Sequence, residues 1–320
     1  MDKSLLCLLS DGQFHSGQEL GTLLGVGRSA VWKQLRRLES DTGIELHRVP
    51  GKGYRLASPL SLLDGERMAP ALQELGWAWQ LHDQVDSTNT QCLRSLSGCD
   101  SMPLLVLAEG QSAGRGRRGR AWVSPSYHNL YLSLGLRLEQ GAHKLSGLSL
   151  VAGLAVLQGI RKFGLTSAGL KWPNDILVRG RKLAGVLLEL TGDPSDVCHV
   201  VIGVGVNVNM LTAPDVDQAW TSLRIETGSV VDRTKLALEL AASLEAYLAR
   251  HTALGFEALR EEWQAHHLWQ GKVCDLHSPT RTTRGIVDGI AADGALRMLV
   301  EGREQFFSAG ELSLRLTNDS

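Results

Sequence analysis

The feature that most constrains the fold lies in the first 60 residues, where three short helical patterns give way to two short strand patterns. The third helical pattern, residues 28–40, is amphipathic, because its apolar positions recur at i, i+4 and i+7 as Val31, Leu35 and Leu38. The two strand patterns flank the turn at residues 50–53. Helices joined by a short glycine-containing turn and followed by a two-stranded wing predict a winged helix-turn-helix domain over residues 1–60.

The exposed side of the third helix is basic. Its polar positions Ser29, Lys33 and Arg36 lie at i, i+4 and i+7, so they share one face. Such a face can enter the major groove, while a lysine at the wing tip holds a flanking phosphate. The residues predicted to bind DNA are Arg28, Ser29, Trp32, Lys33, Arg36 and Lys52. The alternative is a solvated basic face on a protein-interaction module.

Charge and cysteine content restrict the remaining possibilities. The formal net charge is −1, so the whole chain has no general attraction for polyanions, and any DNA binding must come from local charge. The five cysteines include no CxxC pair, which favours a reducing cytoplasm over a disulfide framework or a zinc site. The apolar run at residues 5–9 is too short to span a membrane. We therefore expect a soluble, cytoplasmic protein without a membrane segment.

The rest of the chain reads as two further domains. Strand and helix patterns alternate over residues 61–270, which is typical of a large mixed α/β domain. Residues 271–320 carry only strand and turn patterns, with a hairpin signal at Asp293-Gly294, and predict a small β-barrel or sandwich. The expected fold class is α+β with three domains, at residues 1–60, 61–270 and 271–320.

A glycine-rich basic loop follows an apolar strand at residues 104–108. Residues 114–120 read Gly-Arg-Gly-Arg-Arg-Gly-Arg, four arginines and three glycines in seven positions. Glycines let the backbone approach a ligand closely, and guanidinium groups bind phosphate or carboxylate. Because so many like charges repel one another, we predict a loop that is mobile when empty and orders around an anion. The alternative is a solvated loop that binds nucleic acid nonspecifically.

Four shorter motifs each have an ordinary structural explanation when they are considered alone. Asp86-Ser87-Thr88-Asn89 suits a helix N-cap, and Lys171-Trp172-Pro173-Asn174-Asp175 and Arg181-Lys182-Leu183-Ala184-Gly185 suit charged strand ends. The glycine-punctuated run at residues 201–209 suits a core strand with a bulge. As a group they offer hydroxyls, amides and lysines to a polar head group and to phosphates.

In this order and spacing, DSTN (86–89), QSAGRGRRGRAW (111–122), KWPND (171–175), RKLAG (181–185) and VGVN (204–207) resemble the biotin protein ligase family. The resemblance implies a central domain of the class II synthetase type and an SH3-like β-barrel at the C-terminus. With the winged helix, it extends over essentially the whole chain and indicates the bifunctional subgroup, which joins a ligase to a biotin-operon repressor.

The resemblance also assigns roles to residues. It implies that Lys182 and Arg117 are catalytic and that Asp175 holds Mg²⁺. The residues it implies for biotin are Ser87, Thr88, Asn89, Gln111, Arg115, Gly116, Arg117 and Lys182. Those it implies for ATP are Arg118, Arg120, Trp122, Lys171, Asn174 and Asn207.

The implied activity is the ATP-dependent formation of biotinyl-5′-AMP and transfer of biotin to a lysine of the biotin carboxyl carrier protein of acetyl-CoA carboxylase. The adenylate would also promote a homodimer that binds operator DNA and represses biotin synthesis. Three alternatives stay open: a lipoate-type acyl ligase, a biotin-sensing repressor without ligase turnover, and a ligase whose winged helix no longer binds DNA.

Overall fold

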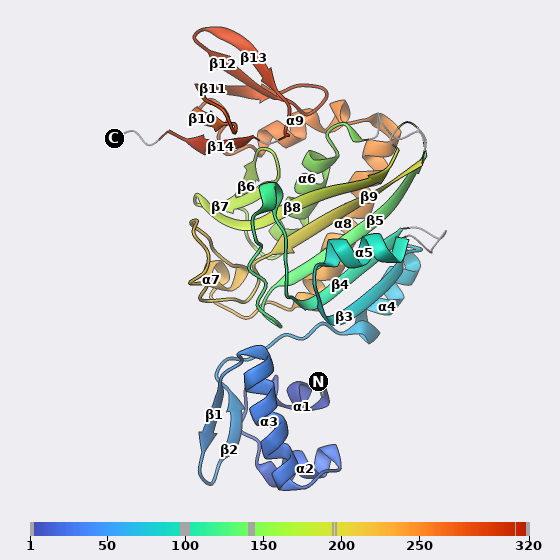
Figure 1. Cartoon of the computed structure of the whole chain (residues 1–320), viewed down its shortest axis with the longest axis vertical. Helices are drawn as coiled ribbons and strands as arrows, with labels where there is room; N and C mark the ends of the chain where they lie inside the picture. The colour runs from blue at the N-terminus through green and yellow to red at the C-terminus, as the bar shows by residue number, and fades with distance from the viewer. Residues whose placement is uncertain are drawn as a thin grey trace.

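The computed structural model describes residues 3–96, 103–139, 145–193, 195, 197–310 and 312–317, and Cys99 lies outside these ranges. The described residues form a two-stranded, a seven-stranded and a five-stranded sheet, which follow one another along the long axis of the molecule (Figure 1). This arrangement confirms the predicted fold class. No helix in the described ranges is long and apolar enough to cross a membrane.

The N-terminal unit is the predicted winged helix-turn-helix. Its elements are α1 (Lys3–Leu9), α2 (Gly17–Leu24), α3 (Arg28–Thr42), β1 (Leu46–Val49) and β2 (Gly53–Leu56). The sequence Ser16-Gly17-Gln18-Glu19 predicts a capping box, and this box begins α2: the Ser16 hydroxyl accepts from the backbone N–H of Glu19, whose carboxylate accepts from the Ser16 N–H. The predicted stripe of Val31, Leu35 and Leu38 is buried in this unit's own core.

An extended linker joins this unit to the central sheet and is fastened by a fully buried ion pair. Arg233, at the start of α8 (Arg233–Leu254), pairs with Glu109 near the end of β4 (Leu104–Gln111). Glu109 also accepts from the N–H of Leu63 at 2.8 Å, and the Arg233 Nε donates to the Ser61 carbonyl at 2.6 Å. Linker residues 61–63 are therefore held by both side chains of the ion pair.

The central sheet is mixed and has the order β3-β4-β5-β9-β8-β7-β6. Its other strands are β3 (Ala78–Val85), β5 (Leu130–Glu139), β6 (Ala168–Lys171), β7 (Asp175–Val178), β8 (Arg181–Gly192) and β9 (Val197–Val206). Among the described strand pairs of this sheet, β3 and β4 alone are parallel. The central strands β5 and β9 are almost entirely buried because helices cover both of their faces.

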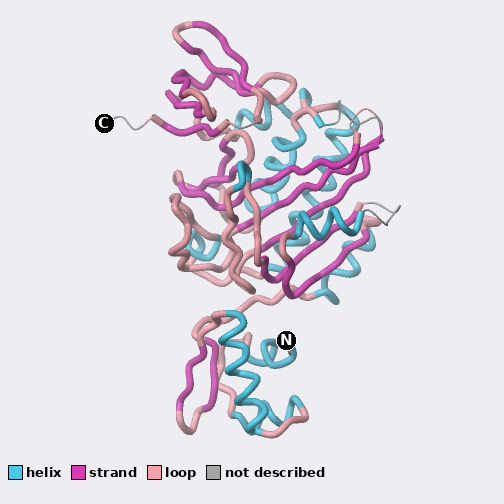
Figure 2. The backbone as a smooth tube through the Cα atoms, in the orientation of Figure 1, coloured by secondary structure: helices cyan, strands magenta, loops and turns pink. Residues whose placement is uncertain are grey.

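Short α5 (Thr88–Leu96) covers one face of this sheet, and α6 (Leu148–Arg161) with α8 covers the other, as the helices in Figure 2 show. Helix α4 (Gly65–Glu74) packs on α8 and β3. The long helix α6 is buried on nearly every side, which matches its almost wholly apolar sequence.

The C-terminal sheet has the order β13-β12-β11-β10-β14 and follows α9 (Glu257–Ala265). Its strands are β10 (Val273–His277), β11 (Thr282–Ile290), β12 (Leu296–Val300), β13 (Arg303–Phe307) and β14 (Ser313–Leu316). The hairpin predicted at Asp293-Gly294 joins β11 to β12. All the strand pairs described in the C-terminal sheet are antiparallel, which fits a small barrel-like module.

Two details differ from the sequence-based expectations. The apolar run at residues 185–190 predicts a strand over those residues, but β8 begins at Arg181, so the RKLAG motif lies within the strand. Strand β9 pairs with β5 and β8 without a register shift, so the expected bulge is absent from the glycine-punctuated run. These glycines instead make room for side chains of the pocket described below.

Candidate active site

One pocket of about 330 Å³ opens between the central sheet, the arginine loop and the C-terminal sheet. Every residue of the central domain to which the resemblance assigns a role lines it: Ser87, Thr88, Asn89, Gln111, Arg115, Gly116, Arg117, Arg118, Arg120, Trp122, Lys171, Asn174, Asp175, Lys182 and Asn207. These residues come from five separate segments of the chain. Their roles toward a ligand remain predictions.

The topology explains why these segments meet. Parallel strands β3 and β4 end side by side, so the start of α5 and the arginine loop (residues 112–121) leave the sheet at the same edge. Strand β8 starts where β9 ends, because the two are antiparallel, and this brings Lys182 close to Asn207. The turn between β6 and β7 adds the KWPND residues beside Lys182.

One end of the pocket is neutral and polar. The hydroxyl of Ser133 on β5 lies 2.6 Å from Asn89 Oδ1 and 2.8 Å from Thr88 Oγ1. Gln111 Oε1 accepts from the Thr88 N–H at 2.8 Å, and Gln111 Nε2 donates to Ser124 Oγ at 3.0 Å. This network fixes groups that suit an uncharged head group with both donors and acceptors.

The floor of the pocket needs two glycines of β9. A Cβ on Gly203 would lie 2.1 Å from Asn89 Oδ1, and a Cβ on Gly205 would lie 2.5 Å from the Trp122 ring. The Trp122 indole therefore packs directly against β9 at Gly205. Its Nε1–H is buried and makes no hydrogen bond within the described part of the chain, so a donor is available at this surface.

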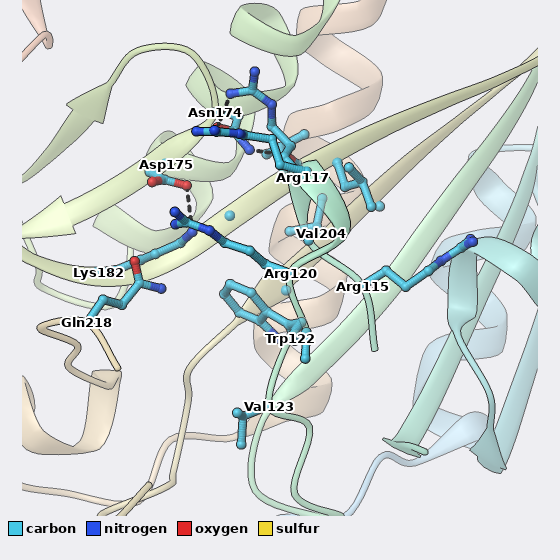
Figure 3. A pocket seen from close by; sticks show the side chains of 18 of the residues that line it. Arg115, Arg117, Arg120, Trp122, Val123, Asn174, Asp175, Lys182, Val204 and Gln218 are labelled. Atoms are coloured by element: carbon cyan, nitrogen blue, oxygen red, sulfur yellow. Dashed lines mark hydrogen bonds and ion pairs between the residues drawn. The ribbon is translucent and has the colours of Figure 1, made fainter. Parts of the chain in front are cut away.

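The other end of the pocket is cationic (Figure 3). Lys182 Nζ lies 2.7 Å from Asp175 Oδ1 and 5.3 Å from the centroid of the Trp122 ring. Lys171 Nζ lies 3.6 Å from Asp175 Oδ2 and sits over the Trp269 ring. Burial lowers the pKa of Lys171, although the nearby Asp175 carboxylate opposes this. One carboxylate thus faces two ammonium groups that are mostly shielded from solvent.

Arg117 extends away from the neutral end. Its guanidinium donates to Asn174 Oδ1 at 3.2 Å and to the backbone carbonyls of Ala309 and Gly310 just before β14. Burial lowers the pKa of Arg117, and Asp175 again opposes the shift. In this structure Arg117 joins the arginine loop to the C-terminal sheet, whereas Arg115 points in the opposite direction (Figure 3).

The segment before α7 (Leu223–Thr227) supports Lys182 from behind. Asn207 Nδ2 donates to the carbonyls of Thr221 at 3.0 Å and Lys182 at 3.3 Å. The backbone N–H of Lys182 donates to Ala219, and its carbonyl accepts from the Thr221 N–H, both at 2.9 Å. The Asn207 amide is therefore occupied in holding the lysine strand.

The pocket can bind anions but offers no built metal site. Six lysines and arginines line it, against three aspartates at positions 175, 215 and 217. Among the described residues, no group of three or more His, Cys, Asp or Glu side chains gathers to hold an ion. Asp175 alone suits an ion that arrives on substrate phosphates, as Mg²⁺ commonly does, rather than a resident one.

In the N-terminal unit, all six residues predicted to bind DNA are exposed. Arg36 stacks on the exposed Trp32 ring, with its guanidinium carbon 4.6 Å from the ring centroid. Arg48 on the wing pairs with Glu39 of α3, which ties the wing to that helix.

Sequence reasoning missed several residues of the site. Trp220 and Leu312–Leu314 line the pocket, although they come from segments without a recognisable motif. Ser133 and Glu189 do not line it but hydrogen-bond to Asn89, and they occupy buried or half-buried strand positions that look like ordinary core pattern. A polar residue inside an otherwise apolar strand was the only available signal, and it applies to Ser133 alone.

Comparisons with known proteins agree with this architecture. The sequence profile of the biotin/lipoate A/B protein ligase family matches residues 81–207, and an HTH domain profile matches residues 2–55. The chain is similar to the bifunctional ligase/repressor BirA of Salmonella typhimurium, with 40% identity over 98% of this chain and 97% of that protein. For BirA of Escherichia coli the identity is 39%, over 97% and 96%.

Among solved structures, the biotin protein ligase from Aquifex aeolicus in complex with biotin and ATP is similar at a TM-score of 0.67 and 27% identity. The match covers 75% of this chain and 99% of that one. The 40% identity to BirA of Salmonella typhimurium over nearly the full length of both chains, together with the helix-turn-helix and ligase family matches, decides the family. The chain belongs to the bifunctional ligase/repressor family of biotin protein ligases.

Proposed function

We propose that this chain activates biotin with ATP to biotinyl-5′-AMP and then transfers the biotinyl group to a lysine of a biotin carboxyl carrier protein. The observation that supports this most strongly is the polarity of the pocket. A neutral hydrogen-bonding end around Thr88 and Asn89 suits the uncharged ureido ring. A cationic end around Lys182 suits a carboxylate and phosphates.

In the first step, a biotin carboxylate oxygen bonds to the α-phosphorus of ATP while the bond to the leaving pyrophosphate breaks. Two anions must approach each other, and charge builds on the phosphoryl oxygens. Lys182 is mostly shielded, and its ammonium exchanges its Asp175 partner for the reacting oxygens, which offsets the repulsion. Arg118 and Arg120, exposed in the loop, and Lys171 neutralise the remaining phosphate charge.

In the second step, the amine of the carrier lysine attacks the acyl carbon of the mixed anhydride, an amide forms, and AMP leaves with the bonding electron pair. No protein nucleophile is required, so the pocket needs only to orient the anhydride and exclude water. Trp122 and the arginine loop cover the reacting centre, which suits protection of the adenylate from hydrolysis.

We infer that the ion used is Mg²⁺ carried by ATP. Asp175, with the Asn174 oxygen beside it, would hold it at the cationic end of the pocket. When bound, Mg²⁺ would neutralise the leaving pyrophosphate. The substrate ATP and the proposed partner, chromosomal DNA, are both cytoplasmic, which supports the predicted cytoplasmic location.

We infer further that biotinyl-5′-AMP acts as a corepressor by promoting a homodimer that presents two copies of α3 to a palindromic operator. The exposed basic face of α3 and the Lys52 wing tip support this. Gel filtration with and without biotin and ATP tests the dimer, and a monomer under both conditions contradicts it.

The ligase proposal is tested without a carrier protein. The chain is incubated with ATP-Mg²⁺ and biotin or lipoate, and released pyrophosphate and bound adenylate are measured by mass spectrometry. Biotinyl-5′-AMP formation with no lipoyl product supports the proposal. A lipoyl adenylate would favour a lipoate-type ligase, and binding of synthetic biotinyl-5′-AMP without its formation would favour a sensor-only repressor.

A further inference from the structure

One carboxylate that does not line the pocket contacts two residues that do, and it has no part in the reaction proposed above. Glu189 lies on β8 with 26% of its side chain exposed. Its Oε2 accepts a hydrogen bond from Asn89 Nδ2 at 2.7 Å and another from Arg115 Nη2 at 2.8 Å. A single oxygen therefore joins the first turn of α5 to the arginine loop.

On its buried side, Glu189 decides how the Asn89 amide is oriented. An ionised carboxylate only accepts, so it faces the amide NH₂ and turns Oδ1 toward the Ser133 hydroxyl, 2.6 Å away. The amide lies against Gly203, where even a Cβ would collide with it at 2.1 Å, so it has little room to turn. Ser133 continues the network to Thr88, which is hydrogen-bonded to Gln111.

On its open side, Glu189 holds Arg115. The Arg115 side chain is 44% exposed, and its backbone pairs with Ala121 of the same loop. Ion pairs this exposed contribute little to global stability, so the contact can open and close with the loop at small cost. The ion pair with Glu189 nevertheless holds Arg115 beside the Asn89 end of the pocket.

We propose that Glu189 is a positioning residue that couples the biotin head-group pocket to closure of the arginine loop. It orients the Asn89 amide and, through the same oxygen, draws Arg115 over that end of the pocket. The proposal rests on biotin as the ligand. It predicts that Glu189 governs biotin affinity and loop order but not the chemistry at Lys182 at the far end.

The test compares Glu189→Gln with Glu239→Gln, whose carboxylate is 28% exposed and pairs with Lys162 away from the pocket. Biotin binding is measured by calorimetry without ATP. Glu189→Gln should weaken binding about tenfold, as expected for the loss of charge-assisted hydrogen bonds, while Glu239→Gln does not change it. At saturating biotin, kcat and the KM for ATP should stay within about threefold of wild type.

Two further readouts separate positioning from a general structural role. Trypsin should cut the arginine loop faster in ligand-free Glu189→Gln than in Glu239→Gln. In an Arg115→Gln background, Glu189→Gln should weaken biotin binding by a clearly smaller factor than in wild type, because the two residues act together. If Glu189→Gln does not fold, Glu189→Asp keeps the charge but withdraws it from both partners, and it should weaken biotin binding likewise.

Equal biotin affinity and equal trypsin sensitivity in Glu189→Gln and Glu239→Gln would overturn the inference, as would additive effects of the Glu189 and Arg115 changes. These outcomes are distinct from failure of the proposed function, in which the wild-type protein itself would not bind biotin.

Discussion

The buried pair between Arg233 and Glu109 gives a quantitative prediction for stability. Both side chains are fully buried, and the Arg233 guanidinium also donates to the carbonyls of Ser61 and Asn129. Arg233→Met removes these donors, and among the described residues the Leu63 N–H is then the one hydrogen-bond donor left to the Glu109 carboxylate. Loss of one member of a buried, hydrogen-bonded pair costs about 3–5 kcal/mol, which for a domain of roughly 200 residues lowers Tm by about 10 °C.

The assay is urea unfolding followed by tryptophan fluorescence. Seven of the eight tryptophans lie at position 77 or beyond, so the signal reports mainly on the central and C-terminal sheets. The control is Arg250→Met on the same helix, because Arg250 and Glu262 are 45% and 31% exposed and their pair should contribute less than about 1 kcal/mol. Adding Glu109→Gln to Arg233→Met should recover part of the loss, since it removes the unpaired buried charge. An Arg233→Met loss no larger than that of Arg250→Met would refute this reasoning.

Three further predictions address the pocket, acid stability and DNA binding. Gly205→Ala should displace the Trp122 ring, because the added Cβ would collide with it. The overpacking cost of about 1–3 kcal/mol should lower kcat/KM for adenylate formation by about tenfold or more. An unchanged kcat/KM would contradict the packing of Trp122 on β9. Burial lowers the pKa of His267 to about 4, so between pH 6.5 and 4 the unfolded chain binds a proton that the folded chain does not. The free energy of unfolding therefore falls by about 3 kcal/mol as pH falls through this window. His267→Asn should flatten the dependence of the urea midpoint on pH, and an unchanged dependence would contradict this assignment. Arg36→Ala should weaken binding to a DNA duplex that carries the upstream region of the biotin-synthesis genes. It should also reduce the slope of log K against log salt concentration by about 1. An unchanged slope would show that Arg36 does not contact a phosphate.

Much of the fold was predictable because local patterns and tertiary structure agree. The capping box at Ser16, the stripe on α3 and the hairpin at Asp293-Gly294 depend on short-range chemistry, and all three are confirmed. Strand β6 and helix α9 were not predicted, since β6 has only four residues and α9 is short and mostly polar. Their packing against neighbouring elements stabilises them more than their own sequence does.

For the site, the sequence predicts which residues take part but not the contacts between distant segments. Motifs in five segments identified the residues that share one pocket. Each motif combines charged or polar residue types that are unfavourable to place close together unless they bind a ligand. The roles of the β9 glycines were not predictable, since they depend on Asn89 and Trp122, which are distant in sequence. The contact of Arg117 with residues 309–310 and the contact of Glu189 with Asn89 likewise join segments separated by at least 100 residues.

The most direct test of the central claim is transfer of biotin to a carrier domain. The protein is mixed with biotin, ATP-Mg²⁺ and a biotin carboxyl carrier domain, and the mass of the carrier is followed with time. Lys182→Ala is compared with Lys162→Ala, an exposed lysine paired with Glu239 outside the pocket. We predict biotinylated carrier with the wild-type protein and Lys162→Ala, and a rate at least about a hundredfold lower with Lys182→Ala. No mass increase with folded wild-type protein and a competent carrier, or an unchanged rate in Lys182→Ala, would contradict the account.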